Sequence, residues 1–201
     1  MLKFAPEGFP FMVVFGLLAL LFTVLTAFMF YFFRDPDRVT PNRPDAFISP
    51  ADGRVLLVRE SVEVPGFTTP CTQISIFMSP FNVHINRAPC DGVVVSVKHT
   101  AGQFLAAYKE DAPRKNERNE IVFGTVFGNL FIRQCAGFIA RRTVCRATPG
   151  TRLRQGERFG LIKFSSRVDL YVPNGAHVVV KSGDRVFSGE TILAEMTNMK
   201  G

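Results

Sequence analysis

The stretch LIKFSSRVDLYV (residues 161–172) alternates apolar and polar side chains, which is typical of a β-strand. One face of that strand is apolar apart from a single hydroxyl, and its members are Ile162, Phe164, Ser166, Val168, Leu170 and Val172. The opposite face carries Lys163, Ser165, Arg167, Asp169 and Tyr171. A hydroxyl on a buried face needs a hydrogen-bond partner or it destabilises the fold. Ser166 is therefore either a buried serine bonded to the backbone or a residue with a chemical task.

Short runs rich in Val, Ile and Phe, separated by Gly and Pro, recur through the rest of the chain. We predict one helix, over residues 103–111. The predicted strands span 54–59, 73–79, 93–99, 121–127, 129–134, 136–141, 161–172 and 177–181. This pattern indicates a β-dominated domain of mainly antiparallel sheets, sandwich-like or barrel-like, with few short helices.

Two internal repeats punctuate this domain. SPADGRVLLV (49–58) and APCDGVVVSV (88–97) share the pattern P-x-D-G-x-V-x-x-V. PGTRLRQGE (149–157) and SGDRVFSGE (182–190) share G-x-x-[LV]-x-x-G-E. Such Asp-Gly and Gly-Glu turns suit a compact β domain with internal pseudo-symmetry. The second pair resembles turns of lipoyl and biotinyl carrier domains, but we find no carrier lysine at a hairpin tip, so the likeness concerns architecture alone.

Residues 8–33 hold no charged side chain, and such a run is long enough to cross a membrane once as a helix. The run is too long for the apolar part of a signal peptide and lacks a small-residue cleavage site. We therefore predict one N-terminal hydrophobic membrane anchor (1–33), a linker (34–48) and a catalytic β-rich domain (49–201). A re-entrant hairpin and a buried core helix are the alternatives for the apolar run.

The distribution of charge indicates sidedness and partners. Arg34, Arg38 and Arg43 follow the apolar run and only Lys3 precedes it, so the large domain is expected on the cytoplasmic side. The net charge of +7 favours an anionic membrane surface. The sequence has no basic helix, base-stacking aromatic motif or zinc knuckle, so we expect no nucleic-acid partner.

The four cysteines form no Cys-x-x-Cys pair and have no histidine at metal-binding spacing. We therefore expect reduced, buried or half-buried thiols and no metal site.

His84 lies in an irregular segment, SPFNVHINRAPCDG (79–92), between two predicted strands. Histidine is the natural general base at neutral pH, whereas His99 and His177 are expected to be structural. Asp52 in SPADG is either a turn residue, like Asp91 in the other repeat copy, or the residue that orients His84. In the second case Asp52, His84 and Ser166 form a triad.

Six motifs, taken in order, resemble the phosphatidylserine decarboxylase family in its short, membrane-anchored bacterial type. They are YFFRDPDRVTP, SPADGRV, SPFNVHINRAPCDG, NERNE (116–120), CAGFIARR (135–142) and GERFGLIKFSSRVDLYVP (156–173). The resemblance covers nearly the whole chain. It implies decarboxylation of phosphatidylserine to phosphatidylethanolamine at the inner membrane, with the catalytic domain on the cytoplasmic side.

The family also implies that the chain cuts itself and converts Ser166 into a pyruvoyl group. Asp52 and His84 match the residues that activate the serine, whose oxygen attacks the carbonyl of Ser165. The products are fragments 1–165 and 166–201, which stay packed because both contribute strands. The pyruvoyl group then accepts electrons as carbon dioxide leaves the substrate. The sequence leaves a homo-oligomer open.

Two positions depart from the family pattern. Ser165 stands where the family usually has glycine, and Arg87 stands where long-form members have a second histidine. A guanidinium fork suits phosphate or carboxylate, so Arg87 is a candidate substrate-binding residue, with a surface arginine as the alternative. The family's NER matches Asn116, Glu117 and Arg118, which are expected either to shape the substrate site or to make structural hydrogen bonds.

Three other functions are compatible with parts of this pattern. A membrane-anchored serine peptidase shares the anchor and the β-rich domain, but its base is a lysine and its domain faces away from the cytoplasm. A non-enzymatic adaptor explains the repeats and the anchor, but not the set of Asp52, His84 and Ser166. A decarboxylase of another serine-headed lipid explains all of these features.

Overall fold

The structure is a computed structural model that describes residues 9–138, 142–164 and 166–196. The chain divides into two units, Met1–Arg34 and Asp35–Gly201. The first unit contains helix α1 (Phe9–Phe32), whose most apolar window has a mean hydropathy of 2.6. Its length and composition are sufficient to cross a membrane once, which supports membrane association.

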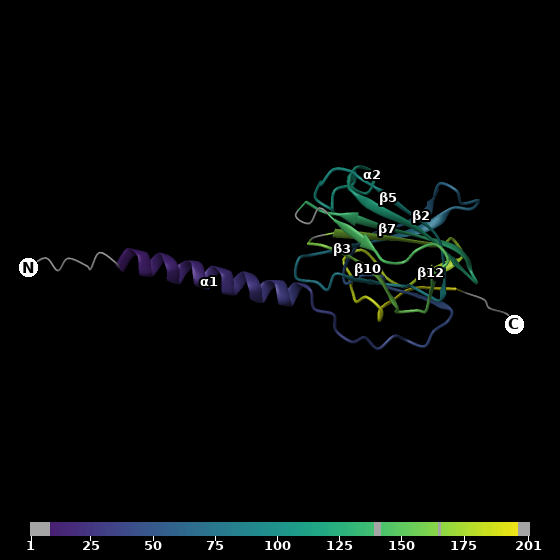
Figure 1. The fold of residues 1–201 in the computed structure, drawn as a ribbon. Helices are drawn as coiled ribbons and strands as arrows, with labels where there is room; N and C mark the ends of the chain where they lie inside the picture. Colours follow the sequence, from purple (N-terminus) through teal and green to yellow (C-terminus); the bar gives the residue numbers. More distant parts are fainter. Residues whose placement is uncertain (1–8, 139–141, 165, 197–201) are drawn as a thin grey trace, which may run out of the picture. The chain divides into compact units, whose positions relative to one another are not determined.

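The second unit is built on one large antiparallel sheet, as its sequence pattern predicts. Within the described residues eight strands form this sheet, in the order β13 (Arg185–Val186), β2 (Gly53–Val62), β3 (Cys71–Met78), β11 (Ser166–Pro173), β7 (Gly128–Ala136), β6 (Arg118–Thr125), β5 (Gly92–Thr100) and β9 (Arg152–Leu153). The short helix α2 (Ala112–Lys115) lies on its outer side (Figure 1). The prediction of a β-dominated domain behind one apolar helix is confirmed.

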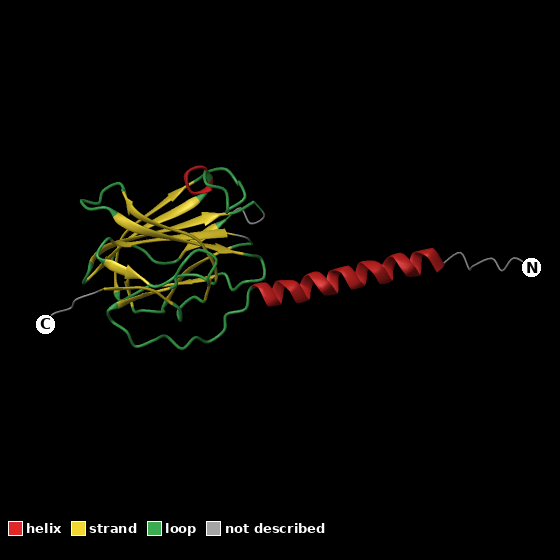
Figure 2. Cartoon of the chain, turned by 180° about the vertical axis from the view of Figure 1, so that it is seen from behind, coloured by secondary structure: helices red, strands yellow, loops and turns green. Residues whose placement is uncertain are grey.

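Two smaller sheets form the other layer of this unit. Among the described residues, one has the order β1 (Ala46–Ile48), β14 (Ile192–Met196), β12 (Ala176–Val178), and the other has the order β4 (Ile85–Arg87), β10 (Arg158–Ile162), β8 (Thr143–Cys145). Figure 2 shows the two layers from behind. The core between them combines Ile76, Val168 and Leu170 of the large sheet with Leu193 and Ile162 of the smaller ones.

The predicted strand 161–172 is wrong as a single element. The chain leaves the small sheet at Ile162, the end of β10, and enters the large sheet at Ser166, the start of β11. Phe164, between the two strands, has a positive φ of 46°. The alternation of apolar and polar residues continues across the break, so hydrophobic pattern alone does not reveal it.

Each copy of the Asp-Gly repeat pairs with one copy of the Gly-Glu repeat, and the two pairs lie at opposite edges of the large sheet. The Asp-Gly copies begin β2 and β5, and the Gly-Glu copies contain β13 and β9. Val186 pairs with Gly53 at one edge, and Leu153 pairs with Gly92 at the other. A Cβ at either glycine would collide with a backbone oxygen of the neighbouring strand, which explains why both copies need glycine there.

Two local predictions differ from the structure. Residues 103–111 are loop and turn because the Asn116 side chain clamps Leu105, accepting from its N–H at 2.8 Å and donating to its carbonyl at 2.7 Å. The segment 34–48, expected to be a linker, contains β1, which pairs with β14. The burial expected of the cysteines is confirmed, since Cys71, Cys90 and Cys135 are buried and Cys145 is half-buried.

Candidate functional site

Ser166 is the first residue of the central strand β11 and is fully buried. Met78 of β3 lies opposite it on one side and Ala136 of β7 on the other. Its hydroxyl donates to the Met78 sulfur at 3.2 Å. Because a thioether is a weak acceptor, little hydrogen-bond energy opposes transfer of the hydroxyl proton to a base.

The backbone just before Ser166 is conformationally strained. Phe164 occupies the left-handed region, which costs a side-chain-bearing residue about 1–2 kcal/mol. Ser165, the residue expected on the other side of the cut, lies outside the described residues. The strain is therefore two positions from Ser166, on the segment that joins the two layers.

His84 is 3% exposed and is fixed by its own loop. Its Nδ1 lies 2.9 Å from the carbonyl oxygen of Asn82, which can only accept, so Nδ1 carries the proton and Nε2 is the basic nitrogen. Asn82 in turn accepts from the backbone and hydroxyl of Ser79, which closes the turn. The His84 carbonyl accepts from Ile162 at the end of β10, so the base segment is bonded to the strand that leads to Ser166.

Asp52 is 4% exposed and its carboxylate accepts several hydrogen bonds. Arg38 donates to both oxygens at 3.1 and 2.9 Å, and the backbone N–H of Ser188 donates to Oδ1 at 2.7 Å. Arg38 also donates to Glu190 at 2.9 Å. These two partners of Asp52 come from two segments far apart in sequence, so the carboxylate is held in one orientation.

Ser188 connects Asp52 to the histidine segment. Its N–H binds Asp52, and its hydroxyl donates to the carbonyl of Ile85 at 3.3 Å. Ile85 directly follows His84 and pairs with Leu161 of β10. The structure thus joins the segments that carry Asp52 and His84 to each other and to β10, the strand that precedes Ser166 in the chain.

The Arg87 side chain is buried and contacts other residues of the chain. Its guanidinium is 3.0 Å from Asp35 and donates to the carbonyls of Gly156 and Pro36 at 3.1 and 3.3 Å. Burial lowers the pKa of Arg87, and Asp35 and Asp52 act in the opposite direction. These contacts give Arg87 a structural task beside Asp52.

Asn116, Glu117 and Arg118 hold loops beside Ser166. Asn116 is fully buried and donates to the carbonyl of Ala136, the strand partner of Ser166, at 2.7 Å. Glu117 accepts from the Thr143 N–H at 2.9 Å, and Arg118 donates to the Arg114 carbonyl at 2.9 Å. Of the two expectations for these three residues, these bonds favour the structural one.

Exposed aromatic residues mark the same end of the sheet. β3 ends at Met78 and β7 ends at Ala136, the two residues that pair with Ser166. The loops that follow carry Phe81 and Phe138, each 66% exposed. Large apolar side chains exposed beside a buried reactive group suit an apolar or membrane-bound ligand.

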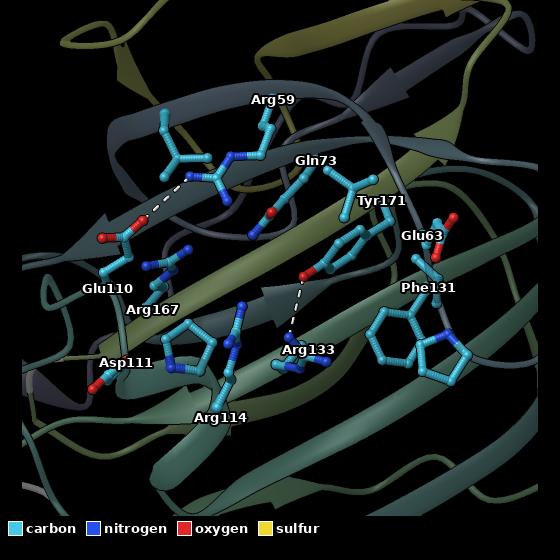
Figure 3. A pocket seen from close by; sticks show the side chains of 15 residues that line it. Arg59, Glu63, Gln73, Glu110, Asp111, Arg114, Phe131, Arg133, Arg167 and Tyr171 are labelled. Carbon is cyan, nitrogen blue, oxygen red and sulfur yellow. Dashed lines mark hydrogen bonds and ion pairs between the residues drawn. The ribbon is translucent and has the colours of Figure 1, made fainter.

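The opposite face of β11 lines a polar pocket of about 480 Å³ (Figure 3). Arg167 and Tyr171 point into it, and Arg133 donates to the Tyr171 hydroxyl at 3.1 Å. Burial, with Asp169 second, raises the pKa of Tyr171 to about 12, so the phenol stays protonated at neutral pH. Because side chains alternate along a strand, this pocket lies across the sheet from Ser166.

The cysteines offer no rival nucleophile. Burial raises the pKa of Cys90 and Cys135 to about 12, and it also raises the pKa of Cys71 and Cys145. Since the thiolate is the reactive form, these thiols are inert at neutral pH.

Residues 25–194 match the family model described as phosphatidylserine decarboxylase. The chain belongs to the phosphatidylserine decarboxylase family. It is similar to the phosphatidylserine decarboxylase proenzyme of Magnetococcus marinus, with 42% identity over 211 residues, covering 98% of this chain and 95% of that relative. The match to the phosphatidylserine decarboxylase model includes Asp52, His84 and Ser166, and the resemblance found in the sequence is confirmed.

Sequence reasoning missed four contacts of this site. They involve Arg38, Met78, Asn82 and Ser188. Of these four, only Ser188 could have been found from the repeats, because it occupies the position of Gln155 in the other Gly-Glu copy. The backbone N–H of each residue donates to the aspartate of its Asp-Gly copy at 2.7 Å.

Proposed function

We propose that this protein decarboxylates phosphatidylserine to phosphatidylethanolamine with a pyruvoyl group that it makes by cutting its own chain between Ser165 and Ser166. The observation that carries the proposal is the burial of Ser166 at the start of a central strand, two residues after Phe164, whose φ is positive. Membership of the phosphatidylserine decarboxylase family supports the substrate. The relative's name, a proenzyme, supports processing.

The surroundings of Ser166 fit a pyruvoyl group. Strand pairing with Met78 and Ala136 holds the residue on both sides, so a new chain end here stays in place. Ser166 is buried, which limits the access of bulk water to the reacting atoms. Once formed, the group supplies an electron sink for the loss of carbon dioxide.

His84 is the general base in this proposal. Nε2 of His84 takes the hydroxyl proton of Ser166, and the oxygen attacks the carbonyl carbon of Ser165. The peptide C–N bond breaks and an ester forms, with the Ser166 nitrogen taking a proton. Elimination from Ser166 then releases the carboxylate of fragment 1–165, and hydrolysis releases ammonia. The Asn82 carbonyl accepts from Nδ1, so Nε2 is the nitrogen that can take this proton.

Asp52 stabilises the positive charge that His84 gains. Its orientation is fixed by Arg38 and Ser188, and Ser188 also bonds to the segment that carries His84. A buried carboxylate near an imidazolium stabilises it more strongly than one in water does.

The two fragments stay together after the cut. Fragment 166–201 contributes β11 to the centre of the large sheet and β13 to its edge. It also contributes β14, which pairs with β1 of the other fragment. Residues of both fragments fill the same core. Separation would expose that apolar surface to water, which is strongly unfavourable.

A lipid substrate is consistent with the surface around the site. The apolar helix α1 and the exposed Phe81 and Phe138 suit a protein that works at a bilayer. The excess of arginine after α1 favours the cytoplasmic side of the inner membrane for the catalytic domain. Arg87, Asn116, Glu117 and Arg118 act by holding loops around the site.

The test is product formation by the purified full chain in detergent micelles. We expect the wild-type protein to convert phosphatidylserine into phosphatidylethanolamine and Ser166→Ala to form none, because the variant has no hydroxyl to process. A second arm offers a serine-headed lipid with ether-linked chains. Turnover of the ether lipid alone would replace the proposed substrate, and turnover of neither lipid by a processed protein would overturn the proposal.

A further inference from the structure

Arg38 makes a buried ion pair with Asp52. Its Nη2 lies 3.1 and 2.9 Å from the two carboxylate oxygens, and its Nη1 lies 2.9 Å from Glu190. The Arg38 side chain is 11% exposed and that of Asp52 is 6% exposed. Removing one partner of such a pair leaves a buried charge uncompensated, which is far costlier than losing a surface pair.

We propose that Arg38 is a positioning residue that keeps Asp52 ionised and correctly oriented for cleavage of the chain before Ser166. The inference rests on the proposed function, because self-cleavage is the step that it affects. Arg38 acts only through Asp52 and its neighbours. It lies in the segment that directly follows α1, so the residues after the membrane helix complete the site.

The segment around Arg38 is bound to the domain at several points. Asp35 contacts Arg87 at 3.0 Å and Arg158 at 2.7 Å. The backbone N–H of Val39 donates to Glu190 at 3.3 Å. The Glu190 carboxylate therefore accepts hydrogen bonds from the Arg38 side chain and from the neighbouring backbone N–H. These two bonds hold the guanidinium in position to bind Asp52.

Two arginines act on Asp52 electrostatically. Arg38 touches it, and Arg87 interacts with it at longer range while paired with Asp35. Glu190 faces Arg38 from the opposite side, and His84 belongs to the segment bonded to Ser188. Without Arg38, Asp52 holds a proton to higher pH. A protonated Asp52 cannot stabilise a charged His84, so self-cleavage requires more alkaline conditions.

Arg43 provides a matched control. It pairs with Asp45 through two 2.9 Å hydrogen bonds and reaches Glu195 at 3.1 Å, so its partners are also two carboxylates. The Arg43 side chain is 43% exposed, and its two partners lie at the pairing of β1 with β14, with Asp45 just before β1 and Glu195 in β14. An effect that follows from losing any arginine that joins two carboxylates therefore also appears in Arg43→Gln.

The experiment measures the rate of self-cleavage of the full chain from pH 6 to 9, for wild type, Arg38→Gln, Arg38→Lys and Arg43→Gln. For Arg38→Gln we expect a rate about tenfold lower at pH 7 and a profile displaced to higher pH. Arg38→Lys keeps the charge, so its pH profile should lie at the same pH as that of wild type. Its rate of self-cleavage should be lower at every pH. Arg43→Gln should match wild type in both.

Each outcome has one meaning. A folded Arg38→Gln with the wild-type rate and pH profile overturns the inference. If Arg38→Gln does not fold, an Arg38→Lys profile displaced in pH overturns it, because the lysine retains the charge. A wild-type chain that is never cut refutes the proposed function itself, which is a different result from a cut wild type with an unaffected variant.

Discussion

The two places where an Asp-Gly copy meets a Gly-Glu copy have the same backbone hydrogen bonds and different side chains. In one, Asp52 accepts from the Ser188 N–H at 2.7 Å, and in the other Asp91 accepts from the Gln155 N–H at the same distance. The N–H of the next glycine, Gly189 or Gly156, donates at 2.9 Å to the carbonyl of the first residue of the Asp-Gly copy, Ser49 or Ala88. The aspartate therefore has a turn-forming role that is independent of chemistry.

The surroundings of the two aspartates are different. Asp52 is buried and paired with Arg38, whereas Asp91 is exposed. The Ser188 hydroxyl bonds to the histidine segment, whereas the Gln155 amide bonds to carbonyls near β1. In one copy the turn is thus structural, and in the other Ser188 joins the same turn to the segment that carries His84.

Replacing each aspartate by asparagine separates the two roles. Asparagine keeps one oxygen for the turn N–H, so the turn bond remains, whereas the charge is lost and, at Asp52, so is one of the two acceptors of Arg38. We expect Asp52→Asn to slow self-cleavage about 100-fold or more, since triad aspartates contribute on this scale. Asp91→Asn should cleave at the wild-type rate. Time courses by denaturing gel measure both, and equal slowing of the two variants would abolish the distinction.

The side chains of Ser188 and Gln155 give a smaller contrast. Ser188→Ala removes the bond to Ile85, and we expect self-cleavage to slow about fivefold because the histidine segment is less well positioned. Gln155→Ala removes bonds to three carbonyls and should lower the free energy of unfolding by about 1–3 kcal/mol. The cleavage rate of folded Gln155→Ala should be unchanged. Chemical denaturation and cleavage kinetics on both variants decide whether the effects separate in this way.

Cys90 sits where the other copy has Ala51, and both are buried. Cys90→Ala makes the copies more alike and should cost about 1 kcal/mol of stability, with unchanged self-cleavage. Because burial raises the pKa of Cys90 to about 12, alkylation of the folded protein at this residue should be negligible at pH 7 and rise only at strongly alkaline pH. Rapid alkylation of Cys90 at pH 7 in the folded protein would contradict this burial.

The comparison also explains how far the sequence predicts the structure. Long strands with alternating residues, such as β3 and β6, were predictable because one face is apolar. Strands of two or three residues, such as β9 and β13, are too short to show a period. The break before Ser166 was missed because the alternation runs through it.

The site was predictable only in part. Asp52, His84 and Ser166 follow from residue type and family motif. Arg38 lies in a Pro- and Asp-rich segment that resembles a linker, and its partner Glu190 is distant in sequence. Contacts of that kind depend on how the repeats pair across the fold, which no local pattern encodes.

The most direct test of the account is an intact-mass measurement on the purified full chain under denaturing conditions. The account predicts two fragments, 1–165 and 166–201, with the smaller lighter by one ammonia than the same fragment with a serine amine. A single uncut chain would contradict it. A cut that leaves an ordinary amino group on Ser166 would contradict it as well, because simple hydrolysis makes no pyruvoyl group.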